Sequence, residues 1–361
     1  MKNIILIFLS IYLFGCKNSN ELLINYTNPQ IEYAGRIDTT QNKGADLYWS
    51  GSSIKINFEG ESIFATLKDD TGDNYYNIII DNDSIHIIRP NTIQTTYLLA
   101  KGLTKGNHSV EIFKRTEWDR GKSTFFNFKI KGNAKVLPRS TTTKRKIEFY
   151  GNSISAGYAV EDFSGMDSPD SIYTNNYLSY TALTARYYNA EFRCICRSGI
   201  GIMISWPGNT LNTMPEIYDR LIPTDSLSKW DFSNFSPDIV VVNLFQNDAW
   251  LVNLPNNPAF KTRFGSVKPN DEFIINSYKT FILELRKHYP IANIICILGN
   301  MSITKKGSKW MGYVSKAVSE LNDDKIYVHF IPYKGTNGHP SIKEQEELSK
   351  SLIKFIDENI K

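Results

Sequence analysis

The sequence predicts two domains of different class, an all-β sandwich or jelly roll over residues 29–135 and an α/β domain over residues 144–361. The front region contains short segments rich in β-branched and aromatic residues, with no helical pattern between them. The back region alternates strand-like and helix-like segments. A polar stretch, residues 133–144, separates the two, and a chain of 361 residues is long enough for two domains of ordinary size.

The front region consists of strand-like segments of regular spacing, separated by Gly, Asn and Asp. Such spacing is typical of an antiparallel sandwich or jelly roll. The segments are residues 45–60, 62–70, 75–83, 95–103, 107–117 and 123–132.

The back region predicts a parallel sheet with helices on both faces, a flavodoxin-like three-layer arrangement. Continuous apolar runs such as Ile239–Val242 are typical of strands that are covered on both faces, and strand–helix alternation produces parallel pairing. A capping box, Ser341 to Glu344, opens the last helix. The expected strands are residues 146–151, 191–199, 238–245, 292–299 and 326–333, and the expected helices are 177–188, 271–289, 309–322 and 341–360.

The composition is that of a globular protein, with 41% hydrophobic and 22% charged residues. The formal net charge of +4 is spread without long basic runs, so we expect no nucleic-acid partner. Aromatic residues make up 13% of the chain, which fits a β-rich structure and a carbohydrate-binding surface. The sequence gives no indication of the oligomeric state.

The N-terminus resembles the export signal of a bacterial lipoprotein. Lys2 precedes an apolar run, Ile4–Leu13, that is too short to cross a bilayer but suits a signal peptide. The run ends in "LFGC", so residues 1–15 are expected to be removed and Cys16 to be lipidated, with residues 16–28 as a tether. This predicts an exported protein of the bacterial cell envelope, held to the membrane by lipid. The alternative is a simple secretory signal with a coincidental cysteine.

Four residues of chemical interest follow strands of the predicted parallel sheet: Ser153, Gly199, Asn247 and His339. Ligands bind at the carboxyl ends of such strands. Taken singly, they fit a helix cap, a turn glycine, an Asx turn and a loop histidine. Together they supply a nucleophile, a base and donors for an oxyanion, which is the set that acyl transfer requires.

These residues resemble the motif blocks of the SGNH hydrolases: "IEFYGNSISAGY", "RSGIG", "NLFQND" and "GHPS". The front half, with "GRIDTT" and "WSGSSIKINFEG", is similar to the jelly-roll domain of carbohydrate esterase family 2, whose members deacetylate plant polysaccharides. The resemblance implies Ser153 as nucleophile and His339 as base. The N–H groups of Ser153 and Gly199, with the Asn247 side chain, are then expected to form the oxyanion hole.

Three positions depart from the family pattern. Asn152 replaces an acid before the serine, and Phe245 replaces a glycine, which is expected to crowd that wall of the cleft. Thr336 stands where the family has the acid that orients the histidine. The resemblance therefore implies a Ser–His dyad in which a backbone carbonyl, or the Thr336 hydroxyl, holds the ring.

The remaining candidates are aromatic and thiol side chains. Trp206 and Trp250 follow two of the strands and are interpreted either as a platform for a sugar ring or as packed loop anchors. Asp248 contacts substrate or braces its loop. Cys194 and Cys196 have no metal-binding spacing and are interpreted as buried free thiols, and we expect neither a metal nor a cofactor.

The sequence therefore predicts a serine esterase of the carbohydrate O-acetylesterase type, acting on an acetylated polysaccharide or oligosaccharide through an acyl-enzyme. The alternative from another class is a non-catalytic glycan-binding lipoprotein that retains the fold. A lipase is less favoured because no long apolar lid segment is present.

Overall fold

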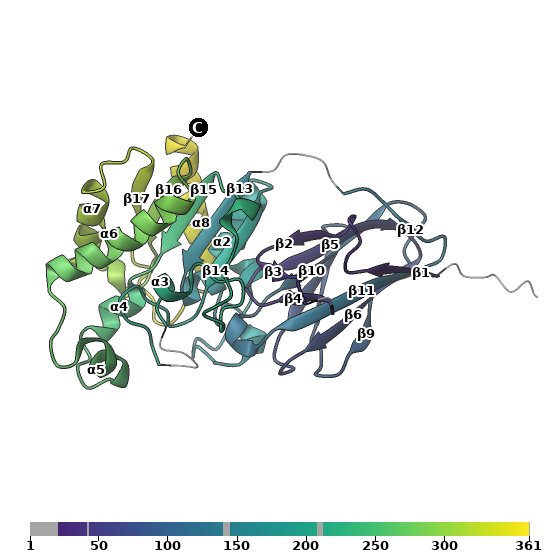
Figure 1. Cartoon of the computed structure of the whole chain (residues 1–361), viewed down its shortest axis with the longest axis horizontal. Coiled ribbons are helices and arrows are strands. Elements are labelled where there is room, and N and C mark those ends of the chain that lie inside the picture. The colour runs from purple at the N-terminus through teal and green to yellow at the C-terminus, as the bar shows by residue number, and fades with distance from the viewer. Residues whose placement is uncertain (1–20, 42, 140–144, 208–211, 361) are drawn as a thin grey trace, which may run out of the picture.

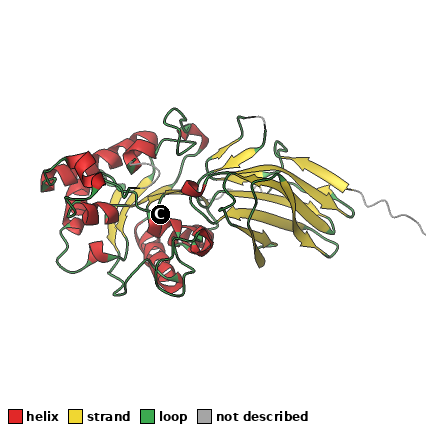
Figure 2. Cartoon of the chain, turned by 90° about the horizontal axis from the view of Figure 1, so that it is seen from below, coloured by secondary structure: helices red, strands yellow, loops and turns green. Residues whose placement is uncertain are grey.

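The computed structural model describes residues 21–41, 43–139, 145–207 and 212–360. They form two domains that follow one another along the long axis of the molecule (Figure 1). The front domain consists of strands and loops with one short helix, η1, between β10 and β11, and the long helices gather in the other domain (Figure 2). Within the described part of the chain, no helix has both the length and the apolar content needed to cross a bilayer. The predicted signal peptide and Cys16 lie outside the described residues.

The front domain is built from two antiparallel sheets of six strands each, as the sequence predicts for a sandwich. One sheet has the order β3-β4-β11-β6-β9 with β1 against β11, and the other has the order β12-β5-β10-β7-β8 with β2 against β5. The strands are β1 (Glu21–Asn25), β2 (Glu32–Ala34), β3 (Ile37–Asp38), β4 (Ala45–Leu47), β5 (Ser53–Glu59), β6 (Ser62–Asp69), β7 (Tyr76–Ile80), β8 (Ser84–Ile88), β9 (Thr95–Lys101), β10 (His108–Lys114), β11 (Ser123–Lys131) and β12 (Lys135–Val136).

The core of the sandwich comes from alternate residues of its strands. On β5, Ile54, Ile56 and Phe58 are buried in one apolar cluster, while Lys55 and Asn57 between them are partly exposed. Phe125 and Phe128 of β11 join the same cluster from the other sheet. Alternation with a period of two places the apolar residues on one face of each strand, where they pack against the opposite sheet.

The first strand lies in the segment that the sequence analysis assigned to a tether, so that assignment is wrong for residues 21–25. β1 pairs with β11 along its whole length, and Ile24 is buried in the sandwich core. A single strand of five residues with mixed exposure carries little periodic signal, and its place is fixed by β11, a hundred residues later.

The second domain contains a five-stranded parallel sheet of order β14-β13-β15-β16-β17. Its strands are β13 (Lys146–Gly151), β14 (Glu191–Cys196), β15 (Ile239–Asn243), β16 (Asn293–Leu298) and β17 (Ile326–Phe330). Its longer helices are α2 (Tyr180–Tyr187), α5 (Pro258–Phe264), α6 (Asp271–His288), α7 (Trp310–Ser319) and α8 (Ile342–Asn359). The shorter helices of the chain are η1 (Trp118–Arg120), α1 (Ser153–Ala156), η2 (Ser171–Tyr173), η3 (Asn176–Leu178), α3 (Met214–Ile217), η4 (Phe232–Asn234), α4 (Gln246–Leu251) and η5 (Ser302–Thr304).

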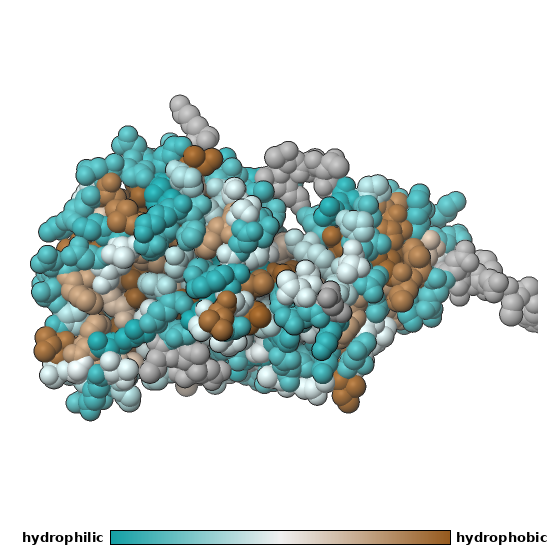
Figure 3. Space-filling model, in the orientation of Figure 1, coloured by the Kyte–Doolittle hydropathy of each residue, from teal (hydrophilic) through white to brown (hydrophobic). Residues whose placement is uncertain are grey.

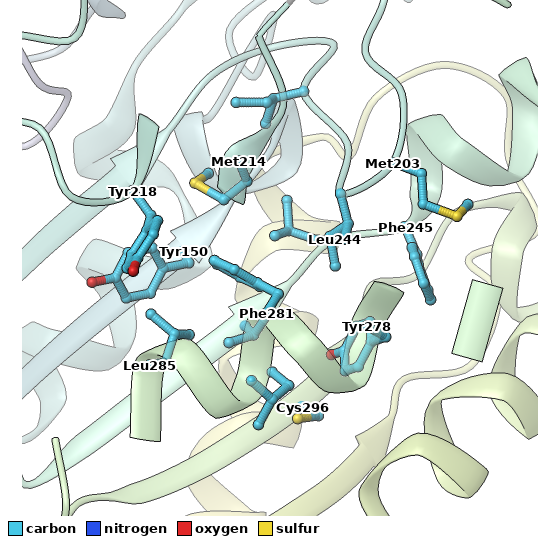
Figure 4. Packing of buried hydrophobic residues seen from close by; sticks show 14 of the residues in the cluster. Tyr150, Met203, Met214, Tyr218, Leu244, Phe245, Tyr278, Phe281, Leu285 and Cys296 are labelled. Atoms are coloured by element: carbon cyan, nitrogen blue, oxygen red, sulfur yellow. The ribbon is translucent and has the colours of Figure 1, made fainter. Parts of the chain in front are cut away.

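Helices cover both faces of this sheet, which confirms the three-layer prediction. Alternate residues of β15 belong to different clusters: Val241 packs with α2 and α8, and Val242 packs with α6 and α7. Figure 4 shows Tyr150 of β13 next to Phe281 of α6, with Cys296 of β16 in the same apolar cluster. The predicted capping box is present, because the Ser341 hydroxyl and the Glu344 carboxylate exchange hydrogen bonds with each other's backbone amides.

Buried polar contacts join the two domains. Arg36 of the sandwich donates to the backbone carbonyl oxygens of Tyr218 and Arg220, and its guanidinium lies 3.2 Å from Glu148 of β13, with both side chains fully buried. Trp49 donates from Nε1 to the Leu221 carbonyl oxygen at 3.0 Å. Buried donors and acceptors of this kind fix one relative placement of two domains, because any other placement would leave them unpaired.

The outer surface is largely hydrophilic, with apolar residues in small groups, one of which lies over the sandwich half (Figure 3). Large apolar side chains with substantial exposure include Leu23 on β1, Ile87 on β8 and Leu98 on β9. Small exposed apolar groups are ordinary in folded proteins.

Candidate active site

Ser153 stands at the end of β13, on the first residue of α1. Gly151 makes the turn possible, since a Cβ there would lie 1.9 Å from Oγ of Ser155. The Asn152 side chain, and not that of Ser153, caps the helix by accepting from the Ile154 amide at 3.0 Å. The capping alternative for Ser153 is therefore wrong, and the substitution at Asn152 retains a capping oxygen. As the first helical residue, Ser153 has an N–H without an intrahelical acceptor.

His339 lies between Ser153 and a carboxylate. Its Nε2 is 2.9 Å from the Ser153 Oγ, and its Nδ1 is 2.9 Å from the Oδ2 of Asp167. The His339 amide also donates to Asp167 Oδ1 at 2.9 Å, so the acid holds both the ring and the backbone of the histidine. With the proton on Nδ1, the lone pair of Nε2 faces the serine hydroxyl, as a general base requires. The Tyr158 ring packs against the imidazole at 4.8 Å.

The dyad that the sequence predicts is wrong, because the structure places three residues in line. Thr336 does not orient the histidine: its hydroxyl donates to Glu344 Oε1 at 2.5 Å and accepts from Lys334. It belongs to the network at the start of α8. Neither a backbone carbonyl nor Asp248 holds His339 Nδ1, and the acid comes from the loop between α1 and η2.

Asp167 was missed by sequence reasoning. It lies in an irregular loop, "VEDFSGMDSPD", that contains four acids and no spacing that singles out one of them. Partial burial alone would raise the pKa of Asp167, but hydrogen bonds from the His339 side chain and amide, together with the charges of His339 and Lys334, lower this pKa below its usual value. The carboxylate is therefore ionised at neutral pH, in the form that stabilises an imidazolium.

The candidate oxyanion donors are the N–H groups of Ser153 and Gly199 and the side-chain amide of Asn247. Gly199 has a φ of +79° and follows β14, and Asn247 lies in the first turn of α4 after β15. One Nδ2 hydrogen of Asn247 is donated to the Ile200 carbonyl oxygen at 2.8 Å, which fixes the amide and leaves its second hydrogen for a ligand. With the N–H of Ser153, these are the groups that the sequence assigned to the oxyanion hole. The structure brings all of them to the wall of one pocket.

Asp248 braces the loop that carries Gly199. It is fully buried and accepts from the backbone amides of Ile202, Met203 and Ile204 at 2.7–3.1 Å. Burial raises the pKa of Asp248 to about 6, against the opposing effect of these amide hydrogen bonds. Of the two roles left open by the sequence, the structure places Asp248 in the bracing one.

Phe245 does not crowd the cleft, and that expectation is wrong. Its side chain is fully buried and packs between the rings of Tyr278 and Trp310. Figure 4 shows Phe245 beside Tyr278. Its backbone has a φ of +79°, the left-handed region that favours glycine. Strain of this kind costs about 1 kcal/mol in a non-glycine residue, and the buried ring offsets this cost.

The catalytic pocket has a volume of about 410 Å³ and carries both predicted tryptophans in its wall. Trp206 and Trp250 meet edge to face at 5.6 Å, and Trp250 is 56% exposed. Tyr158, Ser198, Gln246 and Met301 complete the wall with the residues already described. The site thus combines a nucleophile at its base with an accessible aromatic rim.

A second groove adjoins this pocket across Trp250. It has a volume of about 390 Å³, and Trp250 and Trp310 stand in its wall with Asn253, Ser302 and Ser308. Gln246 from the catalytic pocket donates to Ser302 Oγ at 3.1 Å, which ties the two walls together. Aromatic faces interspersed with hydroxyl and amide groups suit a sugar ring, which has apolar faces and polar edges.

The cysteines and acidic residues of the described part of the chain form no metal site. Cys194, Cys196 and Cys296 are buried free thiols, as expected for the first two. Among the residues that the structure describes, no group of three or more His, Cys, Asp or Glu side chains is arranged to hold a metal ion.

Comparison with known proteins finds relatives of both domains. Residues 33–139 match the family described as carbohydrate esterase 2 N-terminal. The chain is 33% identical over 334 residues to the cellulase/esterase CelE of Acetivibrio thermocellus, and this match covers 90% of the chain but only 39% of CelE. It is 24% identical over 353 residues to an acetylxylan esterase / glucomannan deacetylase of Cellvibrio japonicus, which covers 95% of the chain and 94% of that protein.

A solved structure agrees with these matches over both domains. A family two carbohydrate esterase from Clostridium thermocellum, in complex with cellohexaose, superposes with a TM-score of 0.80 at 31% identity, over 91% of this chain and 98% of that one. The order of the domains, the Ser–Gly–Asn–His blocks and this likeness over nearly the whole length lead to one assignment: the chain belongs to carbohydrate esterase family 2.

Proposed function

We propose that this protein is a serine esterase that removes O-acetyl groups from a plant polysaccharide or its oligosaccharides. The observation that carries the proposal is the hydrogen-bonded line Ser153–His339–Asp167, which opens into a pocket rimmed by Trp206 and Trp250. A protein that only binds glycans has no need of a serine hydroxyl within hydrogen-bond distance of an oriented histidine. The geometry therefore favours catalysis over the non-catalytic alternative.

The reaction follows from the positions of these groups. The Ser153 oxygen attacks the ester carbonyl of the acetyl group, and His339 Nε2 takes the hydroxyl proton. The negative charge that develops on the carbonyl oxygen is stabilised by the N–H groups of Ser153 and Gly199 and by the Asn247 amide. The bond between the acetyl carbon and the sugar oxygen breaks, and His339 returns the proton to this oxygen, which leaves as a hydroxyl group of the sugar, while the acetyl group remains on Ser153. Water, deprotonated by His339, then releases acetate and restores the serine.

Asp167 supports both steps. Its carboxylate keeps the His339 proton on Nδ1 before the attack and stabilises the imidazolium that forms afterwards. The charge is available because the pKa of Asp167 is lowered below its usual value by the hydrogen bonds and charges of His339 and Lys334, which outweigh the effect of burial.

The substrate class is supported by the aromatic surfaces and by the relatives. The relative in Cellvibrio japonicus is an acetylxylan esterase / glucomannan deacetylase, and the related structure from Clostridium thermocellum holds cellohexaose. Here the catalytic pocket and the adjoining groove share the exposed Trp250. A sugar chain that enters the pocket with one acetylated residue and continues along Trp250 toward Trp310 fits both features.

A small ester separates the esterase from a glycan-binding protein. Wild-type protein is expected to hydrolyse p-nitrophenyl acetate well above the rate of the Ser153→Ala variant. Equal rates for the two proteins would favour the binding role, and retained binding of the Ser153→Ala variant to xylan or glucomannan would then be its positive evidence.

We propose further that the protein is a lipoprotein of the bacterial cell envelope, anchored through Cys16. The support is the apolar run Ile4–Leu13 and the "LFGC" sequence that follows it. Radiolabelled palmitate is expected to label the wild-type protein in cells and not the Cys16→Ala variant. Absence of label in the wild type, or label that persists in the variant, would contradict the anchor.

A further inference from the structure

Glu117 belongs to the sandwich domain but contacts the loop that carries the oxyanion donor Gly199. It lies three residues after the end of β10, occupies the N-cap position of η1 without a side-chain capping bond, and is 4% exposed. Both of its carboxylate oxygens meet one residue of the other domain: Oε2 accepts the Ser198 amide, and Oε1 lies 2.5 Å from the Ser198 hydroxyl. A two-point contact fixes both the backbone and the side chain of Ser198.

Ser198 is the residue before Gly199, so its backbone position determines where the Gly199 N–H points. The neighbouring amides of this loop are all held: Arg197 donates to Gly151, Ile200 to Arg197, and residues 201–204 to Ser205 and Asp248. In the part of the chain that the structure describes, the Gly199 amide donates to no protein acceptor. It is left for a ligand in a loop whose other amides are fixed, which is the arrangement that preorganised oxyanion stabilisation requires.

We propose that Glu117 is a positioning residue of the esterase, through which the sandwich domain holds the Gly199 amide in place for the transition state. The sandwich is then part of the catalytic apparatus. This inference rests on the proposed esterase activity, but it adds a residue from outside the hydrolase domain and outside the Ser–Gly–Asn–His blocks.

The segment of the sandwich that contains Glu117, residues 115–120, also supports the loop that carries Asp167. Arg115 donates to the Ile172 carbonyl oxygen at 2.8 Å and forms an ion pair with Glu161, and Arg120 donates to the Pro169 carbonyl oxygen at 2.9 Å. Residues 115–120 thus contact two loops that each carry residues of the catalytic pocket, the loop of Asp167 and the loop of Gly199. Glu117 is the member of this segment that reaches the residue next to an oxyanion donor.

The contact requires hydrogen-bonding geometry and not a negative charge. A carboxylate accepts both hydrogens of Ser198. A glutamine accepts the Ser198 amide through its oxygen and donates to the Ser198 hydroxyl through its nitrogen, so it preserves both contacts. Alanine removes both, and aspartate is one methylene too short to make them together. These three substitutions separate position from charge.

The test measures kcat and KM for p-nitrophenyl acetate in wild type and in Glu117→Gln, Glu117→Asp and Glu117→Ala, after thermal unfolding has shown which variants are folded. Trp49→Phe is the control, because it removes a cross-domain hydrogen bond to Leu221, outside residues 197–206. We expect Glu117→Ala to lower kcat about 100-fold with little change in KM, because the loss of one oxyanion donor typically lowers kcat by about 10²- to 10³-fold. Glu117→Asp should lower kcat about tenfold, and Glu117→Gln and Trp49→Phe should stay within about threefold of wild type.

Each outcome bears on the proposal. Folded Glu117→Ala or Glu117→Asp protein with wild-type kcat would overturn it, and so would a Glu117→Gln variant as impaired as Glu117→Ala. If Glu117→Ala does not fold, the Asp and Gln variants decide. A loss of kcat in Trp49→Phe equal to that in Glu117→Ala would show a general effect of the interface and overturn the specific role. An inactive wild type would contradict the esterase activity itself, and the positioning role with it.

Discussion

The carboxylate of Asp167 lies 2.9 Å from Nδ1 of His339, although 172 positions separate the two residues in the chain. Gly338 permits this approach, since a Cβ at that position would meet Asp167 Oδ1 at 2.9 Å. The acid thus comes from the loop between α1 and η2, after strand β13, and not from the segment just before the histidine. This relationship converts the expected dyad into a triad and determines the first prediction.

Asp167→Asn should lower kcat by roughly 10²- to 10⁴-fold with KM nearly unchanged. An amide can present its NH₂ to Nδ1 and thereby favour the wrong tautomer, and it cannot stabilise the imidazolium. Thr336→Ala is the matched control and should stay within about threefold of wild type, because its hydroxyl contacts Lys334 and Glu344 and not the ring. Steady-state kinetics on p-nitrophenyl acetate check both. Near-normal kcat in a folded Asp167→Asn variant, with a large loss in Thr336→Ala, would restore the dyad.

Asn247→Ala should lower kcat by about 10²- to 10³-fold and change KM little, because the lost amide hydrogen serves the oxyanion. Asn359 provides the control: it is exposed at the end of α8, outside both grooves, and its amide donates to the Phe355 carbonyl oxygen at 2.8 Å. Asn359→Ala should be close to wild type. An effect of Asn247→Ala confined to KM would identify Asn247 as a substrate contact instead.

Much of this architecture could be predicted from the sequence, because the information is local. Continuous apolar runs such as Ile239–Val242 are buried on both faces of a parallel strand, and the capping box at Ser341 starts a helix wherever it occurs. Functional residues at strand ends could likewise be found from position alone, and the structure gathers Ser153, Gly199, Asn247 and His339 around one pocket.

The features that could not be predicted depend on tertiary contacts. Asp167 is one of several acids in an irregular loop, and only the folded loop brings it to His339. The strand β1 is defined by its pairing with β11, and Phe245 occupies a glycine conformation because the core accepts its ring. Glu117 lies in the other domain, so no motif of the hydrolase sequence includes it.

Trp250→Ala and Trp310→Ala should each raise KM for an acetylated oligosaccharide of six sugars by about tenfold, as expected for one lost stacking contact of about 1.4 kcal/mol. KM for p-nitrophenyl acetate should change less than threefold in Trp310→Ala, because that ester does not extend into the adjoining groove and Trp310 is not in the wall of the catalytic pocket. Tyr187→Ala is the control, since Tyr187 is an exposed aromatic residue, 62% exposed, on helix α2 and outside both grooves. Equal effects on the small ester and the oligosaccharide would contradict the glycan groove.

Glu117 predicts a pH dependence of stability. Burial raises its pKa from the usual 4.5 to about 7; Asp119 raises it further, while the Ser198 hydrogen bonds and Arg197 oppose the shift. Because the folded pKa is raised, the contribution of Glu117 to stability is fully present below about pH 4.5 and is lost as the pH rises through about 7.

The Glu117→Gln variant lacks this titration. Its free energy of unfolding relative to wild type should therefore increase by on the order of 3 kcal/mol between pH 4 and pH 8. Urea denaturation of both proteins across this range measures the difference. A constant difference between the two curves would show that Glu117 does not titrate in this way.

The central claim is that Ser153, His339 and Asp167 together deacetylate a glycan, and it is tested most directly by acetate release from acetylated xylan and acetylated glucomannan. Wild-type protein should release acetate from at least one of them and leave the sugar chain intact. Ser153→Ala, His339→Ala and the double variant should all be folded and equally inactive, because the residues act as one unit. Release of acetate by folded Ser153→Ala at the wild-type rate, or no release from either polysaccharide by wild type that hydrolyses p-nitrophenyl acetate, would contradict the account.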